Sequence, residues 1–323
     1  MLLIFSRKIL EALLTLGLAT SILFILIRLA PGDPVAIMIG QSSDVASSNT
    51  ERYEQKLLEL RSEFGLNQTI FQQYFIWMKQ LILFDLGDSI HTGRSVMTEI
   101  ADRLPATILL SVAALFIQIV LGILLGVLSA LKFGRFFDHL TRFLCVLFAS
   151  TPGFVIGLVL LSTFAVTFST YEINTEAKLS RLWLPALTLG MIGAPQWIRT
   201  IRANMLTEFG QPYISSAVSR GLKYRRIVEH AFKNTLLPIV TMTGLSLTTL
   251  ISGAVVIESI FSWPGIGKYA LDSILLKDYP VIQGYALLMI ALVIVIHLVI
   301  EIVYSFIDPR IHRKGEENVK KDY

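Results

Sequence analysis

The residues with side chains suited to catalysis or metal binding are few in this chain and widely spaced. Its histidines lie far apart, at His91, His139, His230, His297 and His312. The sequence has no Cys-x-x-Cys or His-Glu-x-x-His spacing of the kind that holds a transition metal. It also lacks a Gly-x-x-x-x-Gly-Lys-Ser/Thr loop that would hold the phosphates of ATP. We therefore expect no catalytic residue, no metal site and no cofactor bound by this chain.

The remaining reactive groups are isolated in apolar sequence. Cys145, the single cysteine, lies in an apolar run, cannot form an intramolecular disulfide, and is expected to be a buried apolar residue. His297 and Glu301 are four residues apart and so share one helical face. They form either a metal-transit pair or a hydrogen-bonded pair, or Glu301 reaches toward the membrane surface. The last two interpretations are favoured.

The composition indicates a membrane protein. The chain is 54% hydrophobic and 16% charged, with a mean hydropathy of +0.64, whereas a soluble domain carries about 25% charged residues. Its lysines and arginines stand in short loops beside apolar runs, which argues against nucleic acid as a partner and for membrane lipid. We therefore predict an all-α polytopic membrane protein.

Six apolar runs approach or exceed the roughly 20 residues that cross a bilayer as a helix. They are 9–29, 104–131, 140–168, 184–205, 237–260 and 281–307. The first follows Arg7 and Lys8, and it is longer than the core of about 7–15 residues in a signal peptide. We therefore expect an uncleaved first span and about six transmembrane helices.

Helix-breaking residues interrupt two of these runs. Pro152 and Gly153 interrupt the third, and Gly193 with Pro195 interrupts the fourth. Membrane helices tolerate such breaks where neighbouring helices or water satisfy the freed backbone groups. The breaks are therefore either simple kinks or part of a path through a packed bundle.

The placement of lysine and arginine predicts the orientation of the spans. Short outside loops carry only Lys178, Arg181, Lys268 and Lys277, each balanced by nearby acids. The alternate loops are strongly basic: Arg7, Lys8, Lys132, Arg135, Arg142, Arg199, Arg202, Arg220, Lys223, Arg225, Arg226, Lys233, Arg310, Arg313 and Lys314. Both termini are therefore predicted to be cytoplasmic.

This topology divides the chain into four segments: the N-terminus with the first span (1–30), an extracytoplasmic segment (31–103), a transmembrane core with a cytoplasmic loop at 206–236 (104–307), and a cytoplasmic tail (308–323). Within the extracytoplasmic segment, Thr50–Phe64 predicts an amphipathic helix. Ile70–Phe84 predicts a more apolar helix, whose aromatic residues suit the membrane surface.

The cytoplasmic loop has the features of a docking segment. Pro212 suits the start of a helix, and the small residues of Ile214–Arg220 would let that helix enter a cleft in a partner. Gly221 is expected to form a left-handed cap before a second helix at Arg225–Asn234, and Pro238 begins the next span. Topology alone requires only charges, so an ordered docking segment is favoured over a solvated basic loop.

Further stretches rich in turn residues stand at the ends of the spans. Val255–Tyr269 contains the turn Trp263-Pro264-Gly265 and an ionisable residue, Glu258, near the end of the fifth span. Glu258 either pairs within the bundle or faces a path, and the structural role is favoured. The other stretches are Ala30–Pro34, Phe84–Ser89, Arg103–Thr107 and Asp308–Arg310.

In order and spacing, these stretches resemble the dipeptide, oligopeptide and nickel subgroup of binding-protein-dependent ABC importer permeases, specifically the first of its two permease subunits. The resemblance covers essentially the whole chain. Gly221 falls on the glycine of the family's coupling motif, and Leu236-Leu237-Pro238 on its end. Serines stand where other importers carry a glutamate near the start of that motif. Arg220, Arg225 or Arg226 are therefore expected to supply the polar contacts instead.

The resemblance implies a permease of the bacterial cytoplasmic membrane that works by alternating access. The partners that it implies are a second permease subunit, two cytoplasmic ATPase subunits holding ATP and Mg, and an extracytoplasmic substrate-binding protein. Membrane lipid surrounds the permease. The expected cargo is a short peptide, with nickel or a metal chelate as the alternative. An ion-coupled secondary transporter or a membrane scaffold is the alternative of another class.

The resemblance also implies roles for individual residues. The residues expected to couple the chain to the ATPase are Tyr213, Ser215, Ser216, Ala217, Arg220, Gly221, Arg225, Arg226 and Pro238. Apart from the resemblance, the helix breakers Pro152 and Gly153 and the ionisable Glu258 are the residues expected to line or gate the path.

Overall fold

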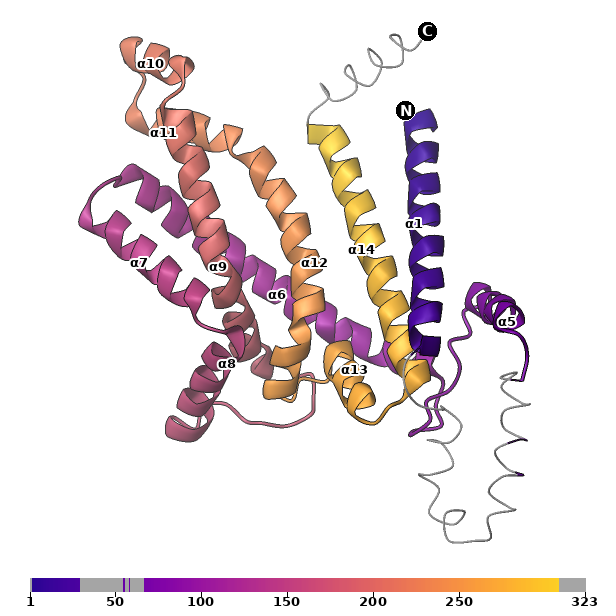
Figure 1. Ribbon diagram of the computed structural model, residues 1–323. Helices are drawn as coiled ribbons and strands as arrows, with labels where there is room; N and C mark the ends of the chain where they lie inside the picture. Colours follow the sequence, from indigo (N-terminus) through magenta and orange to yellow (C-terminus); the bar gives the residue numbers. More distant parts are fainter. Residues whose placement is uncertain (1, 30–54, 56–57, 59–66, 308–323) are drawn as a thin grey trace. The chain divides into compact units, whose positions relative to one another are not determined.

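The computed structural model describes residues 2–29, 55, 58 and 67–307. In this part of the chain the regular structure is helical, and one isolated antiparallel bridge joins Asp88 to Ser95 (Figure 1). Three predictions fall on residues outside the described ones, entirely or almost so: the helix at Thr50–Phe64, the turn at Ala30–Pro34 and the tail from Asp308.

The described helices have the following bounds. In order they are α1 (Leu2–Leu29), α5 (Ile70–Ile82), α6 (Val96–Leu131), α7 (Phe136–Ser150), α8 (Gly153–Leu161), the π-helix η1 (Ser162–Thr167), α9 (Leu179–Phe209), α10 (Pro212–Ser219), α11 (Tyr224–Asn234), α12 (Leu236–Ile260), α13 (Ile266–Leu275) and α14 (Tyr279–Ile307).

Each of the six predicted spans coincides with helix, but not all are equally apolar. Four described helices are long and apolar enough to cross a membrane: α1, α6, α12 and α14. The pair α7 and α8–η1 passes the same test together, which makes five if the pair is one span. Helix α9 does not pass, because no stretch of it is apolar enough: its central part includes Pro185, Pro195 and Gln196, and Arg181 and Arg199 flank that part. The all-α membrane fold is confirmed, while six spans and cytoplasmic termini stay predictions.

The two predicted breaks behave differently. Helix α7 ends at Ser150, Thr151 has extended backbone, and the helix that starts after Pro152 is bent by 98° relative to α7. The predicted interruption at Gly193 and Pro195 is wrong, because α9 runs through both residues. Gly193 instead permits a close approach: a Cβ atom there would lie 2.1 Å from Nε2 of Gln118.

The described chain forms two compact units. The first comprises Met1–Leu104 with Tyr269–Ala291, and the second comprises Pro105–Lys268 with Leu292–Tyr323. In the second unit α9 is central, since it packs against α7, α8, α11 and α12. Its residues Trp197, Ile201 and Met205 are fully buried in the core of that unit.

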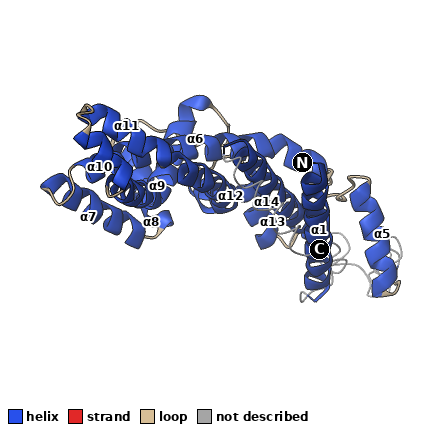
Figure 2. Cartoon of the chain, turned by 90° about the horizontal axis from the view of Figure 1, so that it is seen from above, coloured by secondary structure: helices blue, strands red, loops and turns tan. Residues whose placement is uncertain are grey.

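The first unit contains α1, α5, the start of α6 and the start of α14. Val96 and Ile100 of α6 pack with Val281 of α14 in a small apolar cluster. Helix α6 therefore begins inside the predicted extracytoplasmic segment, before the expected start of the second span at 104. Helix α5 lies beside α1 but does not run parallel to it: Figure 1 shows α1 lengthwise, and the view from above in Figure 2 shows α5 lengthwise.

Candidate functional site

Helices α10 and α11 form a helical hairpin, which we call the coupling hairpin (residues 210–235), and Gly221 makes the turn between them. Gly221 has a φ of +73°, and its N–H donates to the carbonyl of Val218 at 2.9 Å. The N–H of Leu222 donates to the carbonyl of Ala217 at 3.2 Å. These two bonds are those of a Schellman cap, which needs a left-handed residue at the position of Gly221. The predicted left-handed cap is confirmed.

The residues of α10 divide into a buried and an exposed face. Ile214 and Ala217 are buried and pack into the core of the second unit with Ile227 and Ala231 of α11. The opposite face carries Ser215, Ser216, Val218 and Ser219, all exposed, followed by exposed Arg220. Ala217 therefore holds the helix in place, whereas the serines form a surface of small side chains.

A polar cluster closes the base of the coupling hairpin. The hydroxyl of Tyr213 donates to Oε2 of Glu208 at 2.5 Å. The amide of Asn234 donates to both partners, at 3.0 Å to Glu208 Oε2 and 2.9 Å to the Tyr213 hydroxyl. Burial, together with the hydrogen bond to Glu208, raises the pKa of Tyr213 above its ordinary value, so the phenol stays protonated as a donor. The cluster joins the ends of α9 and α11 to the start of α10.

The two arginines of α11 that are predicted to make polar contacts with a partner, Arg225 and Arg226, have exposed side chains. Arg225 donates to Glu229 one helical turn away at 3.2 Å, but its side chain remains 91% exposed, so this pair contributes little to stability. Arg226 is also exposed. Pro238 lies in the first turn of α12 and is half-buried.

An ion pair joins α7 to α9 in the second unit. Arg202 donates to the two carboxylate oxygens of Asp138 at 2.6 and 2.8 Å. Asp138 is buried, and it also accepts hydrogen bonds from Ser129 and from the N–H of Gly134. The carboxylate therefore holds the turn between α6 and α7 against the central helix.

The second unit also contains a cavity of about 600 Å³. Helices α6, α8, α9 and α12 line it, and the lining includes Gly153, Gln118, Ser246 and Gly253 but no charged residue. Trp197 Nε1 donates to Gln118 Oε1 at 3.1 Å and to Ser246 Oγ at 3.0 Å, which fixes the polar part of the wall. The structure places Gly153 on this wall, and Pro152 immediately before it.

Glu258 lies apart from the cavity lining and is fully buried. Its Oε1 accepts from the hydroxyl of Thr107 at 2.6 Å, and its Oε2 accepts from the N–H of Lys268 at 2.9 Å. Thr107 in turn accepts from the N–H of Ile266 at 2.9 Å. The glutamate and the threonine thus satisfy the backbone of the turn at 261–268 and hold it against α6.

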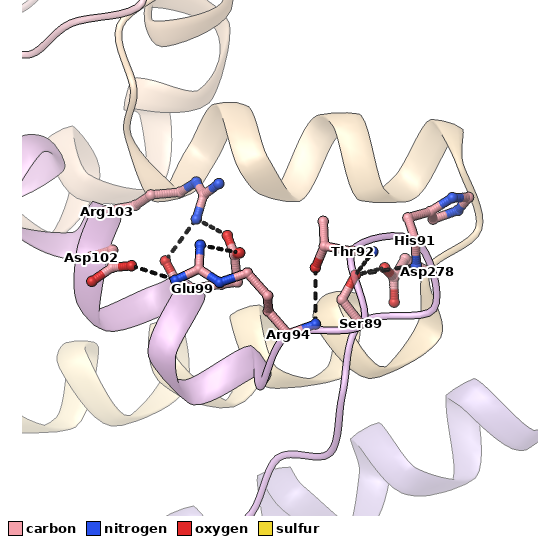
Figure 3. Close-up of polar contacts among 8 residues, drawn as sticks. All are labelled: Ser89, His91, Thr92, Arg94, Glu99, Asp102, Arg103 and Asp278. Carbon is pink, nitrogen blue, oxygen red and sulfur yellow. Dashed lines mark hydrogen bonds and ion pairs between the residues drawn. The ribbon is translucent and has the colours of Figure 1, made fainter.

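A second polar cluster belongs to the first unit (Figure 3). Ser89 donates to Asp278 Oδ2 at 2.6 Å and accepts from the N–H of Thr92 at 3.1 Å. Buried Glu99 pairs with Arg94 at 2.8 Å and with Arg103 one turn along α6. These contacts hold the turn at 88–95 against the starts of α6 and α14.

The structure brings the predicted coupling residues together in one hairpin, with Pro238 just beyond it. It places Gly153 at the cavity, separate from Glu258. Sequence reasoning missed Asp138, Glu208 and Asn234, because each is a single polar residue whose partner lies in another helix. The charge of Asp138 at the edge of an apolar run was the one available signal.

Comparison with known proteins shows the family. The family model described as "Binding-protein-dependent transport system inner membrane component" matches residues 122–313. The model described as "Binding-prot-dependent transport system membrane comp, N-term" matches residues 1–111. The chain belongs to this family: it is a permease component of an ABC importer, a multi-pass protein of the cytoplasmic membrane, and not an enzyme.

Similar proteins span almost the whole chain. A di/tripeptide transport system permease protein DppB of Pseudomonas aeruginosa is 35% identical over 91% of this chain and 94% of its own. The dipeptide permease DppB of Escherichia coli K12 is 32% identical, with the same coverage. The glutathione permease GsiC of Escherichia coli O6:H1 is 30% identical over 95% of this chain and 98% of its own.

A solved structure shares the fold. The inward-facing MetNI methionine ABC transporter matches with a TM-score of 0.53 and 17% identity, over 66% of this chain and 97% of the matched chain. At this identity the match supports the fold of the membrane core and carries no argument about cargo.

Proposed function

We propose that this permease imports short peptides, driven by ATP hydrolysis in partner subunits. The observation that carries the cargo is the agreement of relatives named as dipeptide, di/tripeptide and glutathione permeases at 30–35% identity. These cargoes are all short chains of amino acids joined by amide bonds. Nickel or a metal chelate is the alternative cargo.

The coupling hairpin is the proposed contact with the ATPases. Its exposed face of small serines allows close approach, and exposed Arg220, Arg225 and Arg226 offer charge to acidic groups on a partner. The buried residues of α10 and the cluster at Tyr213 attach the coupling hairpin rigidly to α9. Two ATPase subunits, binding ATP and Mg, would move this hairpin and the matching hairpin of a second permease.

The cavity at Gly153 and Gly253 is the proposed half of the translocation path. A second permease subunit would supply the other half, and an extracytoplasmic binding protein would deliver the cargo. The uncharged lining allows peptides of differing side-chain charge to pass, which leaves selection to the binding protein. Glu258 acts as a structural support at the outer end of α12.

The experiment compares the uptake of labelled cargo by cells that lack the chain with uptake by the same cells complemented with the wild-type chain. Accumulation of a radiolabelled dipeptide that requires the chain and its partner ATPases supports the proposal. Chain-dependent uptake of ⁶³Ni with no dipeptide uptake would replace the peptide by a metal. Uptake that persists when the ATPase subunits are deleted would contradict the ABC mechanism itself.

A further inference from the structure

Helix α5 carries an exposed apolar stripe that the importer function does not explain. Phe71, Phe75 and Ile82 are 72%, 57% and 71% exposed. Their spacing of four and seven residues places them on one side of the helix. The rings of Phe71 and Phe75 touch edge to face at 4.9 Å, and Ile82 lies two turns further along the same side.

A second side of α5 is already occupied by the first span. Tyr74 and Trp77 pack on the buried ring of Phe24 in α1, with centroid distances of 5.3 and 5.4 Å. The Tyr74 hydroxyl is hydrogen bonded to Ser21 Oγ of α1 at 2.8 Å. The exposed stripe therefore needs an occupant other than α1.

The contact with α1 fixes the depth of α5. Phe24 lies close to the end of the apolar segment Lys8–Leu26 that can cross the membrane. Tyrosine and tryptophan gather at that level, where hydrocarbon gives way to headgroups. Helix α1 is seen lengthwise in Figure 1, whereas α5, beside it, is seen lengthwise in the view from above in Figure 2, so α5 runs along the membrane plane when α1 spans the bilayer.

The remaining side of α5 is mainly polar, with Ile76, 45% exposed, between its glutamines. Gln72 and Gln80 lie away from the stripe, and Lys79 lies at its edge, where its ammonium can reach lipid phosphates. The helix is also closed at its start, because Thr69 and Gln72 form a reciprocal capping box. A capped helix with one apolar side and one polar side is the form of an interfacial membrane helix.

We propose that α5 is an interfacial helix whose stripe of Phe71, Phe75 and Ile82 enters the lipid beside α1. The partner of this surface is the bilayer, and the neighbouring α1 also exposes apolar side chains, since Leu14 and Leu18 are each 65% exposed. The inference does not rest on the cargo or on ATPase coupling. It requires only that α1 spans the membrane.

The test uses the single cysteine of the chain. In a full-length Cys145→Ala background, single cysteines replace Phe75, Ile82 and Gln80, and Leu14→Cys in α1 serves as the lipid-exposed reference. Each variant is labelled with bimane and reconstituted in phosphatidylcholine–phosphatidylglycerol vesicles. Brominated phosphatidylcholine should quench the labels at positions 75 and 82 as strongly as at 14, and severalfold more than at 80. Iodide in the buffer should give the reverse order.

Other occupants give other patterns. Strong iodide quenching at positions 75 and 82 would place the stripe in water and overturn the proposal. Protection from both quenchers would assign the stripe to a protein contact and overturn it equally. Because a label at position 75 could disturb packing with Phe71, the label at position 82, beyond the ring contact, decides if the two disagree.

Discussion

A Cβ atom added to Gly265 would lie 2.1 Å from Oε1 of Glu258. The absence of a side chain at Gly265 leaves room for the Glu258 carboxylate, which accepts a hydrogen bond from the backbone of the turn at 261–268. We predict that Gly265→Ala displaces Glu258 from Thr107 and Lys268, at a cost of about 1–3 kcal/mol for buried groups left unpaired. Thermal unfolding in detergent measures this loss.

The matched controls for this prediction are Gly253→Ala, where the added Cβ meets nothing within 4 Å, and a double variant. Gly253→Ala should leave the unfolding temperature close to that of the wild type. Gly265→Ala combined with Glu258→Ala should be no less stable than Glu258→Ala alone, because the obstructing carboxylate is gone. Additive losses in the double variant would show that the two residues do not interact as described.

The ion pair between Asp138 and Arg202 predicts strong coupling between two helices. Arg202→Gln leaves the buried carboxylate of Asp138 without its counter-charge, at a cost of about 3–5 kcal/mol. Asp138→Asn leaves Arg202, whose side chain is 17% exposed, and should cost less. The double variant should lose less than the sum, since neither charge remains. A double-mutant cycle on unfolding in detergent checks this. Independent, additive effects would rule out the pairing.

We predict that substitutions at Gly221 uncouple ATP hydrolysis from uptake to differing degrees but do not prevent folding. A side chain at Gly221 meets nothing within 4 Å, so a substitution acts only through the left-handed backbone, at about 1–2 kcal/mol. Gly221→Asn should keep most uptake, because asparagine tolerates this conformation. Gly221→Val and Gly221→Trp should hydrolyse ATP with little uptake while inserting normally. Full uptake by Gly221→Trp would sink the prediction.

The Tyr213 cluster predicts a specific dependence on pH. Tyr213→Phe removes both hydrogen bonds and should raise hydrogen exchange in α10, with a stability loss of about 1 kcal/mol. The raised pKa of Tyr213 means that the bonded form is fully present below the ordinary tyrosine pKa of about 10. Stability from this cluster should therefore be constant from neutral pH to about 9 and fall as the pH rises beyond 10. A loss that begins near neutral pH would contradict the assignment.

We predict that a large side chain at one glycine of the cavity wall blocks transport without destabilising the fold. Gly253 lines the cavity and faces open space, so Gly253→Leu should fill part of the volume. We expect uptake to fall at least about tenfold, equivalent to about 1.4 kcal/mol on the barrier, with ATPase activity retained. Gly17→Leu in α1, which also faces open space, is the control and should transport normally. Unchanged uptake by Gly253→Leu would exclude the cavity from the path.

Local sequence determined the helices and the turn of the coupling hairpin. Pro212 and Gly221 act within a few residues of themselves, by fixing φ or permitting a positive φ, so their effects can be predicted without tertiary contacts. The break at Pro152 is of the same kind. The apolar runs likewise predict the spans, because a bilayer requires about 20 apolar residues wherever the helix sits.

Only the tertiary structure decided how polar residues are used. The sequence left Glu258 open between a path and a pairing role, and its partners Thr107 and Lys268 became visible only when α6 and the turn at 261–268 met. Pro195 predicted a break that the structure does not have, since α9 continues through it while packing against helices on several sides. Pairs such as Asp138 with Arg202 are set by which helix faces which, and that depends on the summed packing of the whole bundle rather than on any local pattern.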